Sequence, residues 1–274
     1  MSTPMRVALF SLGGVLLAGG IGTASYTGLL VLSSHDVKAE TTFDLPGNSL
    51  WVTSDGGSVR LVRGNEPGKV HVNRTTTESI HGADPEWEMV DGRLRLDTNC
   101  PGFMNVTCDG SYTVTVPRNV NTITVRSDNG AVRAEGLTAE RFDLRSDNGA
   151  IKVRDSVGHL TLESDNGSIS VDTSWAETVE AKSDNGSVKM ALENEPQSVR
   201  AESDNGSVRV TVPLSERRYS VDAKTDNGSQ SVAKQPHDMH DPYSRFRLTL
   251  LSDNGSVKAQ YGTYPPRPLP EPRP

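Results

Sequence analysis

The chain has 274 residues, of which 28 are Lys or Arg and 35 are Asp or Glu, so its formal net charge is −7. This acidic balance argues against nucleic acid as a partner, because phosphate binding needs a cationic surface. Only 5% of the residues are aromatic, and the chain contains 25 Gly and 16 Pro, a composition that argues against a conventional globular enzyme core.

The first segment is directed to a membrane. No charged residue lies from Val7 to Ser34, and the apolar run 7–32 would be about 39 Å long as a helix, enough to cross a bilayer core. Arg6 precedes the run and Asp36 follows it, so the positive-inside rule places the domain that follows outside the cell. We expect residues 1–34 to form the anchor of a single-pass cell-membrane protein.

Cleavage of this segment is the alternative. Gly22-Thr23-Ala24 resembles a small-x-small signal-peptidase site, and cleavage there would give a secreted protein. The apolar stretch Leu29–Leu32 continues beyond that site, which favours an uncleaved anchor. The domain that follows, residues 41–260, is expected to be extracytoplasmic in either case.

The first part of this domain predicts irregular β-structure. The segment 54–57 (SDGG) is a degenerate copy of a turn that recurs later, residues 86–96 predict a hairpin over Asp91-Gly92, and Tyr112–Val116 predicts a strand ended by Pro117. The two cysteines, Cys100 and Cys108, are expected to form a structural disulfide in an oxidising exterior.

An Asp-Asn-Gly repeat dominates the rest of the chain. Seven copies follow one another at spacings of 19, 18, 19, 20, 22 and 27 residues. Self-similarity at this period is typical of a repeat architecture. The aspartates that begin the copies are Asp128, Asp147, Asp165, Asp184, Asp204, Asp226 and Asp253.

The hydrophobic pattern predicts two strands in each repeat. Counted from the Asp, the residues at −5, −3, +4 and +6 are apolar in every copy except for Gln230 at +4 of the sixth. Alternation on both sides of a turn means two strands, each with one buried face. The fold class is therefore all-β, with regular rungs over residues 121–260, where a rung is the pair of strands that flank one turn.

Two arrangements fit this pattern. Asn-Gly also suits a tight hairpin, which would give an antiparallel meander. We favour a β-solenoid, because identical Ser, Asn and Gly residues could then stack in columns about 4.8 Å apart. The variable links, including the insertion within 235–245, would lie on the opposite edge, and the last repeat, with Val257, would end the stack. The proline-rich residues 261–274 predict a disordered, extended tail.

The pattern of strand, VP, strand and S-D-N-G turn behind one membrane segment resembles the bacterial putative-adhesin family of β-strand-repeat proteins, and it is similar to head GIN domains. The residues that carry the resemblance are Thr113–Pro117, the seven SDNG or TDNG turns and Thr211–Pro213. It implies a β-helix over residues 41–260. It implies no catalytic residues, because the family that the chain resembles is a domain of unknown function and supplies none.

The aspartate column is the first candidate site. In a stack the seven carboxylates would lie one above another, and Ca²⁺ could bind them because it prefers several oxygen ligands. The alternative is that each Asp caps its own turn. The spacing matches neither an EF-hand nor a nonapeptide calcium repeat, so we favour capping and expect no cofactor.

A stripe of basic residues at position +5 is the second candidate. These side chains point outward from the second strand of each repeat, where a cationic surface could contact an anionic polymer of the cell wall or lipid headgroups. The alternative is a solvated face that discourages sheet aggregation. The basic members are Arg133, Lys152, Lys189, Arg209 and Lys258, and Ser170 and Ser231 complete the column.

The sequence therefore predicts a surface module of adhesion or scaffold type without catalysis. One alternative is an accessory in envelope-stress sensing, whose exterior domain reports to a membrane partner. A second is a polysaccharide-active enzyme, which would need a pair of acidic residues that the sequence does not single out.

Overall fold

The computed structural model describes residues 35–78, 86–97, 109–234, 237–263 and 265. Over these residues it forms 21 β-strands and no helix, and none of this part offers a helix able to cross a bilayer. The run 7–32, expected to be a membrane anchor, and the expected disulfide Cys100–Cys108 lie outside the described residues. Most of the expected tail 261–274 lies outside them as well, but its first residue, Tyr261, ends a β-strand (β21, Val257–Tyr261) instead of being disordered.

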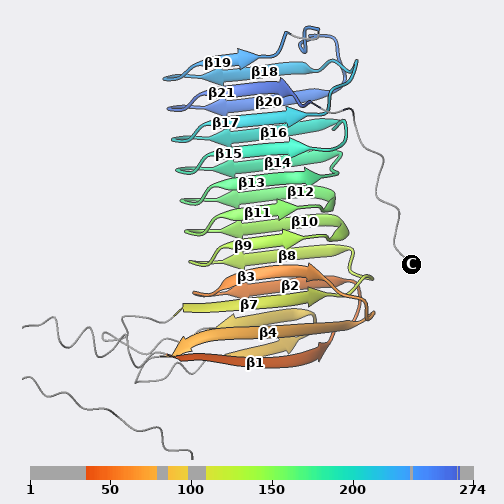
Figure 1. Cartoon of the computed structure of the whole chain (residues 1–274), viewed down its shortest axis with the longest axis vertical. Coiled ribbons are helices and arrows are strands. Elements are labelled where there is room, and N and C mark those ends of the chain that lie inside the picture. The colour runs from red at the N-terminus through yellow and green to blue at the C-terminus, as the bar shows by residue number, and fades with distance from the viewer. Residues whose placement is uncertain (1–34, 79–85, 98–108, 235–236, 264, 266–274) are drawn as a thin grey trace, which may run out of the picture.

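The strands form two long sheets. Sheet A has 11 strands in the order β1-β4-β7-β3-β9-β11-β13-β15-β17-β21-β19, and sheet B has 10 in the order β18-β20-β16-β14-β12-β10-β8-β2-β6-β5. Figure 1 shows the strands stacked as rungs along the long axis, with β1 and β4 at one end and β18 and β19 at the other.

Each repeat gives one strand to each sheet. The strands before the turns belong to sheet B and are β8 (Thr122–Ser127), β10 (Thr138–Ser146), β12 (Val157–Ser164), β14 (Thr178–Ser183), β16 (Ser198–Ser203), β18 (Ser220–Thr225) and β20 (Arg247–Ser252). The strands after the turns belong to sheet A and are β9 (Val132–Glu135), β11 (Ile151–Arg154), β13 (Ile169–Ser174), β15 (Val188–Leu192), β17 (Val208–Val212), β19 (Gln230–Val232) and β21 (Val257–Tyr261).

Neighbouring repeats pair in parallel and with equivalent residues opposite one another. Ile151 pairs with Ile169, for example, and Leu162 with Ala181. A meander of hairpins would pair antiparallel instead. The expected solenoid-like stack is therefore confirmed for the repeats, and the hairpin interpretation of the Asn-Gly turns is wrong.

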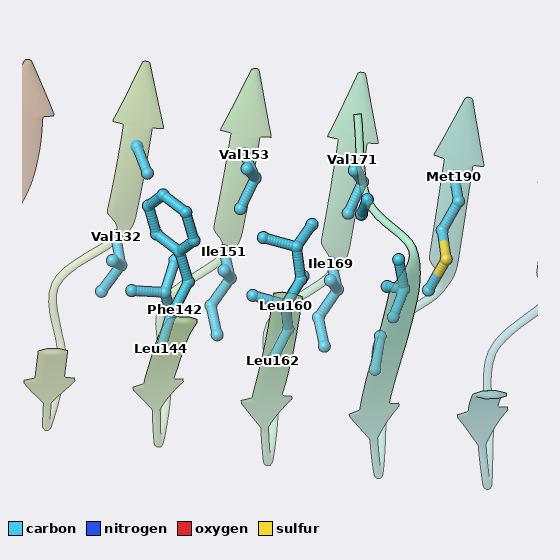
Figure 2. Close-up of a cluster of buried hydrophobic side chains, with 14 of the residues drawn as sticks. Val132, Phe142, Leu144, Ile151, Val153, Leu160, Leu162, Ile169, Val171 and Met190 are labelled. Carbon is cyan, nitrogen blue, oxygen red and sulfur yellow. The ribbon is translucent and has the colours of Figure 1, made fainter. Parts of the chain in front are cut away.

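The core lies between the two sheets. The residues at −5, −3, +4 and +6 are buried in every repeat apart from Val221, Gln230 and Val232. Figure 2 shows Phe142, Leu160 and Leu162 in the space between the strands of the two sheets. All three exceptions belong to the sixth repeat, which lies at the end of both sheets and has no further rung to cover it.

The opposite end of the stack is irregular. The strands here are β1 (His35–Asp44), β2 (Ser49–Ser54), β3 (Ser58–Arg63), β4 (Lys69–Glu78), β5 (Glu86–Val90), β6 (Arg93–Asp97) and β7 (Asp109–Val116). The degenerate copy supplies β2 and β3, which pair in parallel with β8 and β9. The expected hairpin over Asp91-Gly92 is confirmed, since β5 and β6 are antiparallel and both turn residues have positive φ.

The order of the rungs differs from the order of the chain at the C-terminal end. The last repeat (β20 and β21) lies between the fifth (β16 and β17) and the sixth (β18 and β19). After Val212 the chain therefore passes over the position next to the fifth repeat and forms the sixth repeat one rung further on. The last repeat then occupies the position between them. The expectation that Val257 belongs to the terminal rung is wrong, because β21 is covered on both sides.

The link between β19 and β20 packs against this end. Met239 is fully buried, its backbone N–H donates to the carbonyl of Ala233 at 3.0 Å, and the N–H of Tyr219 donates to the carbonyl of Met239 at 2.9 Å. The insertion therefore does more than bulge from an edge, because it is hydrogen-bonded to residues that flank both strands of the sixth repeat, the outermost rung.

Candidate functional site

The repeated turn is held by the serine that precedes the Asp in six of the seven copies. Ser183 Oγ accepts a hydrogen bond from the N–H of Gly186 in its own turn and donates one to the carbonyl of Gly167 in the next rung, both at 2.9 Å. These serines are buried, so a second partner for each hydroxyl matters. The side chain that caps the turn is thus the serine, and none of the seven described Asp-Asn-Gly turns has a hydrogen bond from its backbone to its own Asp carboxylate.

Neighbouring turns lie so close together that only glycine fits at the third position of each Asp-Asn-Gly turn. A Cβ atom on Gly186 would lie 2.2 Å from the carbonyl oxygen of Gly167, and one on Gly167 would lie 2.1 Å from that of Gly149. Real Cβ atoms do not approach a backbone oxygen so closely, so no other residue fits without separating the rungs.

The asparagines form a ladder along the same edge. Asn185 Nδ2 donates to Asn166 Oδ1 at 2.9 Å and to the carbonyl of Asp165 at 3.2 Å. The same side-chain bond joins each rung to the next. In spatial order the ladder comprises Asn129, Asn148, Asn166, Asn185, Asn205, Asn254 and Asn227.

The aspartates are the members of the turn whose side chains the stacking does not use. Their backbone N–H groups bond to the neighbouring rung, as from Asp184 to the carbonyl of Ser164 at 3.2 Å, while their side chains lie at the surface. Arg145 lies 3.7 Å from a carboxylate oxygen of Asp147 and 3.8 Å from one of Asp165. Among the described residues, no three His, Cys, Asp or Glu side chains cluster closely enough to share a metal ion. Calcium binding by the column stays a prediction.

The basic residues at +5 form a column on the outer face of sheet A. Arg133 pairs with Lys152, and Lys152 pairs with Ser170. Beyond Ser170 the column continues without interruption through three cations, because the last repeat is inserted next to the fifth. These are Lys189, Arg209 and Lys258, followed at the end of the sheet by Ser231.

The cations of this column differ in how their charges are compensated. Toward the N-terminal end, Lys152 lies 3.9 Å from Asp172. Arg60 of the degenerate copy continues the column beside Arg133 and lies 2.5 Å from Glu135, whereas Arg133 itself forms no ion pair with a described residue. In the C-terminal half, none of Lys189, Arg209 and Lys258 forms an ion pair with another described residue.

Sheet B differs on two of these three rungs. Lys182 lies 3.8 Å from Asp184, and Arg200 pairs with Glu202. On the rung of Lys258, Arg247 of sheet B forms no ion pair with a described residue, and on the outermost rung Lys224 lies 2.9 Å from Asp222. Three adjacent cations without an ion pair therefore distinguish the C-terminal half of sheet A from the opposite face.

A comparison with models of protein families shows to which family this chain belongs. The model of the Toastrack DUF4097 family matches residues 103–246. The chain belongs to the Toastrack DUF4097 family. The match confirms the resemblance to β-strand-repeat proteins, whose S-D-N-G turns are the ones stacked in this Toastrack domain. A comparison with curated proteins gives no match.

Several solved structures are similar to this Toastrack protein. They are a putative adhesin from Bacteroides fragilis NCTC 9343 (13% identity, 82% of this chain and 97% of that chain, TM-score 0.49), one from Parabacteroides distasonis ATCC 8503 (12%, 81% and 97%, TM-score 0.43) and one from Parabacteroides merdae ATCC 43184 (10%, 82% and 96%, TM-score 0.42).

A hollow of about 490 Å³ lies near the C-terminal end of the Toastrack stack. Arg217 lines it, lies 2.9 Å from Glu195 and stacks 3.8 Å from the ring centroid of Phe246. Nearby, Tyr219 is fully buried, and its hydroxyl has no hydrogen-bond partner among the described residues. Burial raises the pKa of this phenol well above its ordinary value, although Arg217 lowers it in part.

Sequence reasoning placed the Asp and +5 columns on single edges and faces, and the register of the strands agrees with that placement. It missed the capping role of the serine, for which the recurrence of Ser before six of the seven aspartates was an available signal. It could not see that Arg209 and Lys258 are neighbours, because in the sequence Ser231 stands between them.

Proposed function

We propose that this protein is a non-catalytic surface module, displayed outside the cell behind the membrane-directed run 7–32, and that it binds its partner through the outer faces of its sheets. The partner is a polymer of the cell envelope or a component of the membrane.

The observation that carries this proposal is the location of the polar and charged side chains. The inner faces of both sheets are filled by apolar side chains, and the buried serines at the turns are used up by backbone hydrogen bonds. The charged side chains stand instead on the outer faces and along the turn edge. A stack of this kind offers long, regular surfaces, which suit binding to an extended partner.

The dimensions are consistent with display at a surface. Sheet A contains 11 strands, so its ten intervals of about 4.8 Å extend over about 48 Å. Since β1 begins at His35, directly after the membrane-directed run, the irregular end of the stack would lie near the bilayer. The C-terminal rungs would then be held away from it.

Protease accessibility tests the display. Protease added to intact cells should digest the region after residue 35, while a cytoplasmic marker protein stays intact. Full protection of the chain in intact cells, with digestion only after permeabilisation, would contradict the proposal.

A second measurement tests both binding to the cell envelope and the absence of catalysis. The full-length protein in non-ionic detergent should sediment with isolated cell envelopes in a saturable manner and release no soluble sugar from them. Turnover of envelope glycans by the protein would instead favour the polysaccharide-active alternative.

A further inference from the structure

We propose that Lys189, Arg209 and Lys258 form a binding ladder for a linear polyanion, a polymer with repeated phosphate or carboxylate groups that lies along the axis of the stack. The inference rests on the proposed function, since it names the face and the class of partner through which the surface module acts.

The ladder is contiguous only in the folded chain. Lys189 pairs in register with Arg209, and Arg209 pairs in register with Lys258, although 49 residues separate the latter two. Strands of one sheet lie about 4.8 Å apart, so the three cations recur at a regular pitch along the axis. The insertion of the last rung moves Ser231 to the end of the column, where it no longer divides the cations.

The surroundings of the ladder hold no carboxylate in the flanking columns of the same three strands. On one side, nearer the turn, lie the exposed residues Ser187, Ser207 and Ser256. On the other side lie Ala191, Thr211 and Gln260, of which Gln260 donates a hydrogen bond to Thr211 at 3.2 Å. All three cations are exposed, so an anion can approach them without displacing an internal partner.

The net charge of the protein is −7, so its overall charge would repel a polyanion rather than attract it. Like charges stacked at strand spacing repel one another, and sheet B reduces this repulsion on the rungs of Lys189 and Arg209, where Lys182 pairs with Asp184 and Arg200 with Glu202. The unpaired arrangement on sheet A is therefore a local feature that an external anion would stabilise.

The geometry favours a polymer over a small anion. The outer face of a sheet has no enclosing walls, so a single phosphate would meet one cation and open solvent. A chain of linked anions that contacts one cation would reach the next at high effective concentration. The aspartates of the same rungs, Asp184, Asp204 and Asp253, line the turn edge and would keep the polymer on the sheet.

The test uses the immobilised full-length protein in non-ionic detergent at low ionic strength, with binding followed by interferometry. The probes are poly(glycerol phosphate) and polygalacturonate, which separate a phosphate source from a carboxylate source. Neutral dextran and inorganic phosphate serve as controls. We expect at least one of the two polymers to bind, more weakly as salt screens the charges, and dextran and inorganic phosphate to bind at least about tenfold more weakly.

A matched pair of variants assigns the site. The triple substitution Lys189→Gln, Arg209→Gln and Lys258→Gln should weaken polymer binding by about tenfold or more. The control triple Lys182→Gln, Arg200→Gln and Lys224→Gln removes two lysines and one arginine from sheet B, and should leave binding within about twofold, because those cations are already paired.

Equal weakening in both triples would overturn the ladder, since net charge alone would then explain binding. Failure of both polymers to bind the unchanged protein would overturn it as well. Because protease accessibility and retention on envelopes are measured separately, the surface-module proposal would survive either result and fails only on its own tests.

Discussion

Val208 pairs in register with Val257 in sheet A, although 49 residues separate them along the chain. The repeat that comes between them in sequence lies on the far side of Val257, where Gln230 occupies the equivalent position. The only polar residue among the core positions of the seven repeats is thus found on the outermost rung, and its side-chain amide donates to the carbonyl of Ala223. A polar side chain is tolerated there because one face of the rung has no neighbour.

This rung order makes a prediction about stability. Val257→Ala should lower the free energy of unfolding by about 2 kcal/mol, because two methyl groups leave a fully buried site. Val232→Ala, on the half-buried terminal rung, should cost less than about 1 kcal/mol. Denaturant titration of both variants would measure the difference, and a larger loss for Val232→Ala would contradict the inserted position of the last repeat.

Gly186→Ala should be among the most damaging single substitutions in the stack. The added methyl would overlap the carbonyl oxygen of Gly167 at 2.2 Å, so neighbouring turns would have to separate at a cost of about 3 kcal/mol or more. Gly262→Ala is the control, because its nearest contact would be an ordinary 3.5 Å. Thermal melts of the two variants should differ by several degrees, and similar melting temperatures would refute the close stacking of the turns.

The serine cap can be tested against the aspartate of the same turn. Ser183→Ala removes both a hydrogen bond to the carbonyl of Gly167 and the acceptor for the N–H of Gly186, and should destabilise the protein by about 2 kcal/mol. Asp184→Asn leaves these bonds in place and should change stability by less than about 0.5 kcal/mol. If the Asp variant proves the more damaging in denaturant titrations, the capping assignment is incorrect.

Calcium distinguishes a functional aspartate column from a solvated one. If the column binds Ca²⁺, millimolar calcium should raise the melting temperature, and the double change Asp165→Asn with Asp184→Asn should abolish the increase. We expect no increase in either protein, because no described cluster of acids encloses a cation and Arg145 already lies near Asp165. A calcium-dependent increase that disappears in the double variant would show that the column is a cation site.

Tyr219→Phe should leave stability at neutral pH unchanged or raise it by about 1 kcal/mol, because the lost hydroxyl is buried without a described partner. Burial raises the pKa of the phenol, so the folded state holds this proton more tightly than the unfolded chain does. The associated stability is fully present below about pH 10 and is lost as the pH rises beyond it.

The Phe variant lacks this titration and should therefore lose less stability on going from pH 8 to pH 11. Denaturant titrations at both pH values would measure the change. An equal loss in the variant and the unchanged protein would show that other groups, such as Tyr261, dominate alkaline unfolding.

The local structure of each rung follows from the pattern of its own residues. The alternation around every Asp requires a strand before and after the turn, because only that conformation buries −5, −3, +4 and +6 together. Asp91-Gly92 likewise predicted its hairpin, since both residues accept the positive φ that the turn requires.

Which rungs are neighbours, in contrast, depends on contacts between distant parts of the chain. Nearly every repeat presents the same columns of Ser, Asn and Gly to the next, so these columns alone do not select the sixth or the seventh repeat as the neighbour of the fifth. The choice depends on contacts remote in sequence, where the link from β19 packs Met239 into the core beside Tyr219 and returns the chain to the position between the fifth and the sixth repeat. This long-range packing, which no local pattern encodes, sets Arg209 beside Lys258 and leaves Gln230 at the end of the stack.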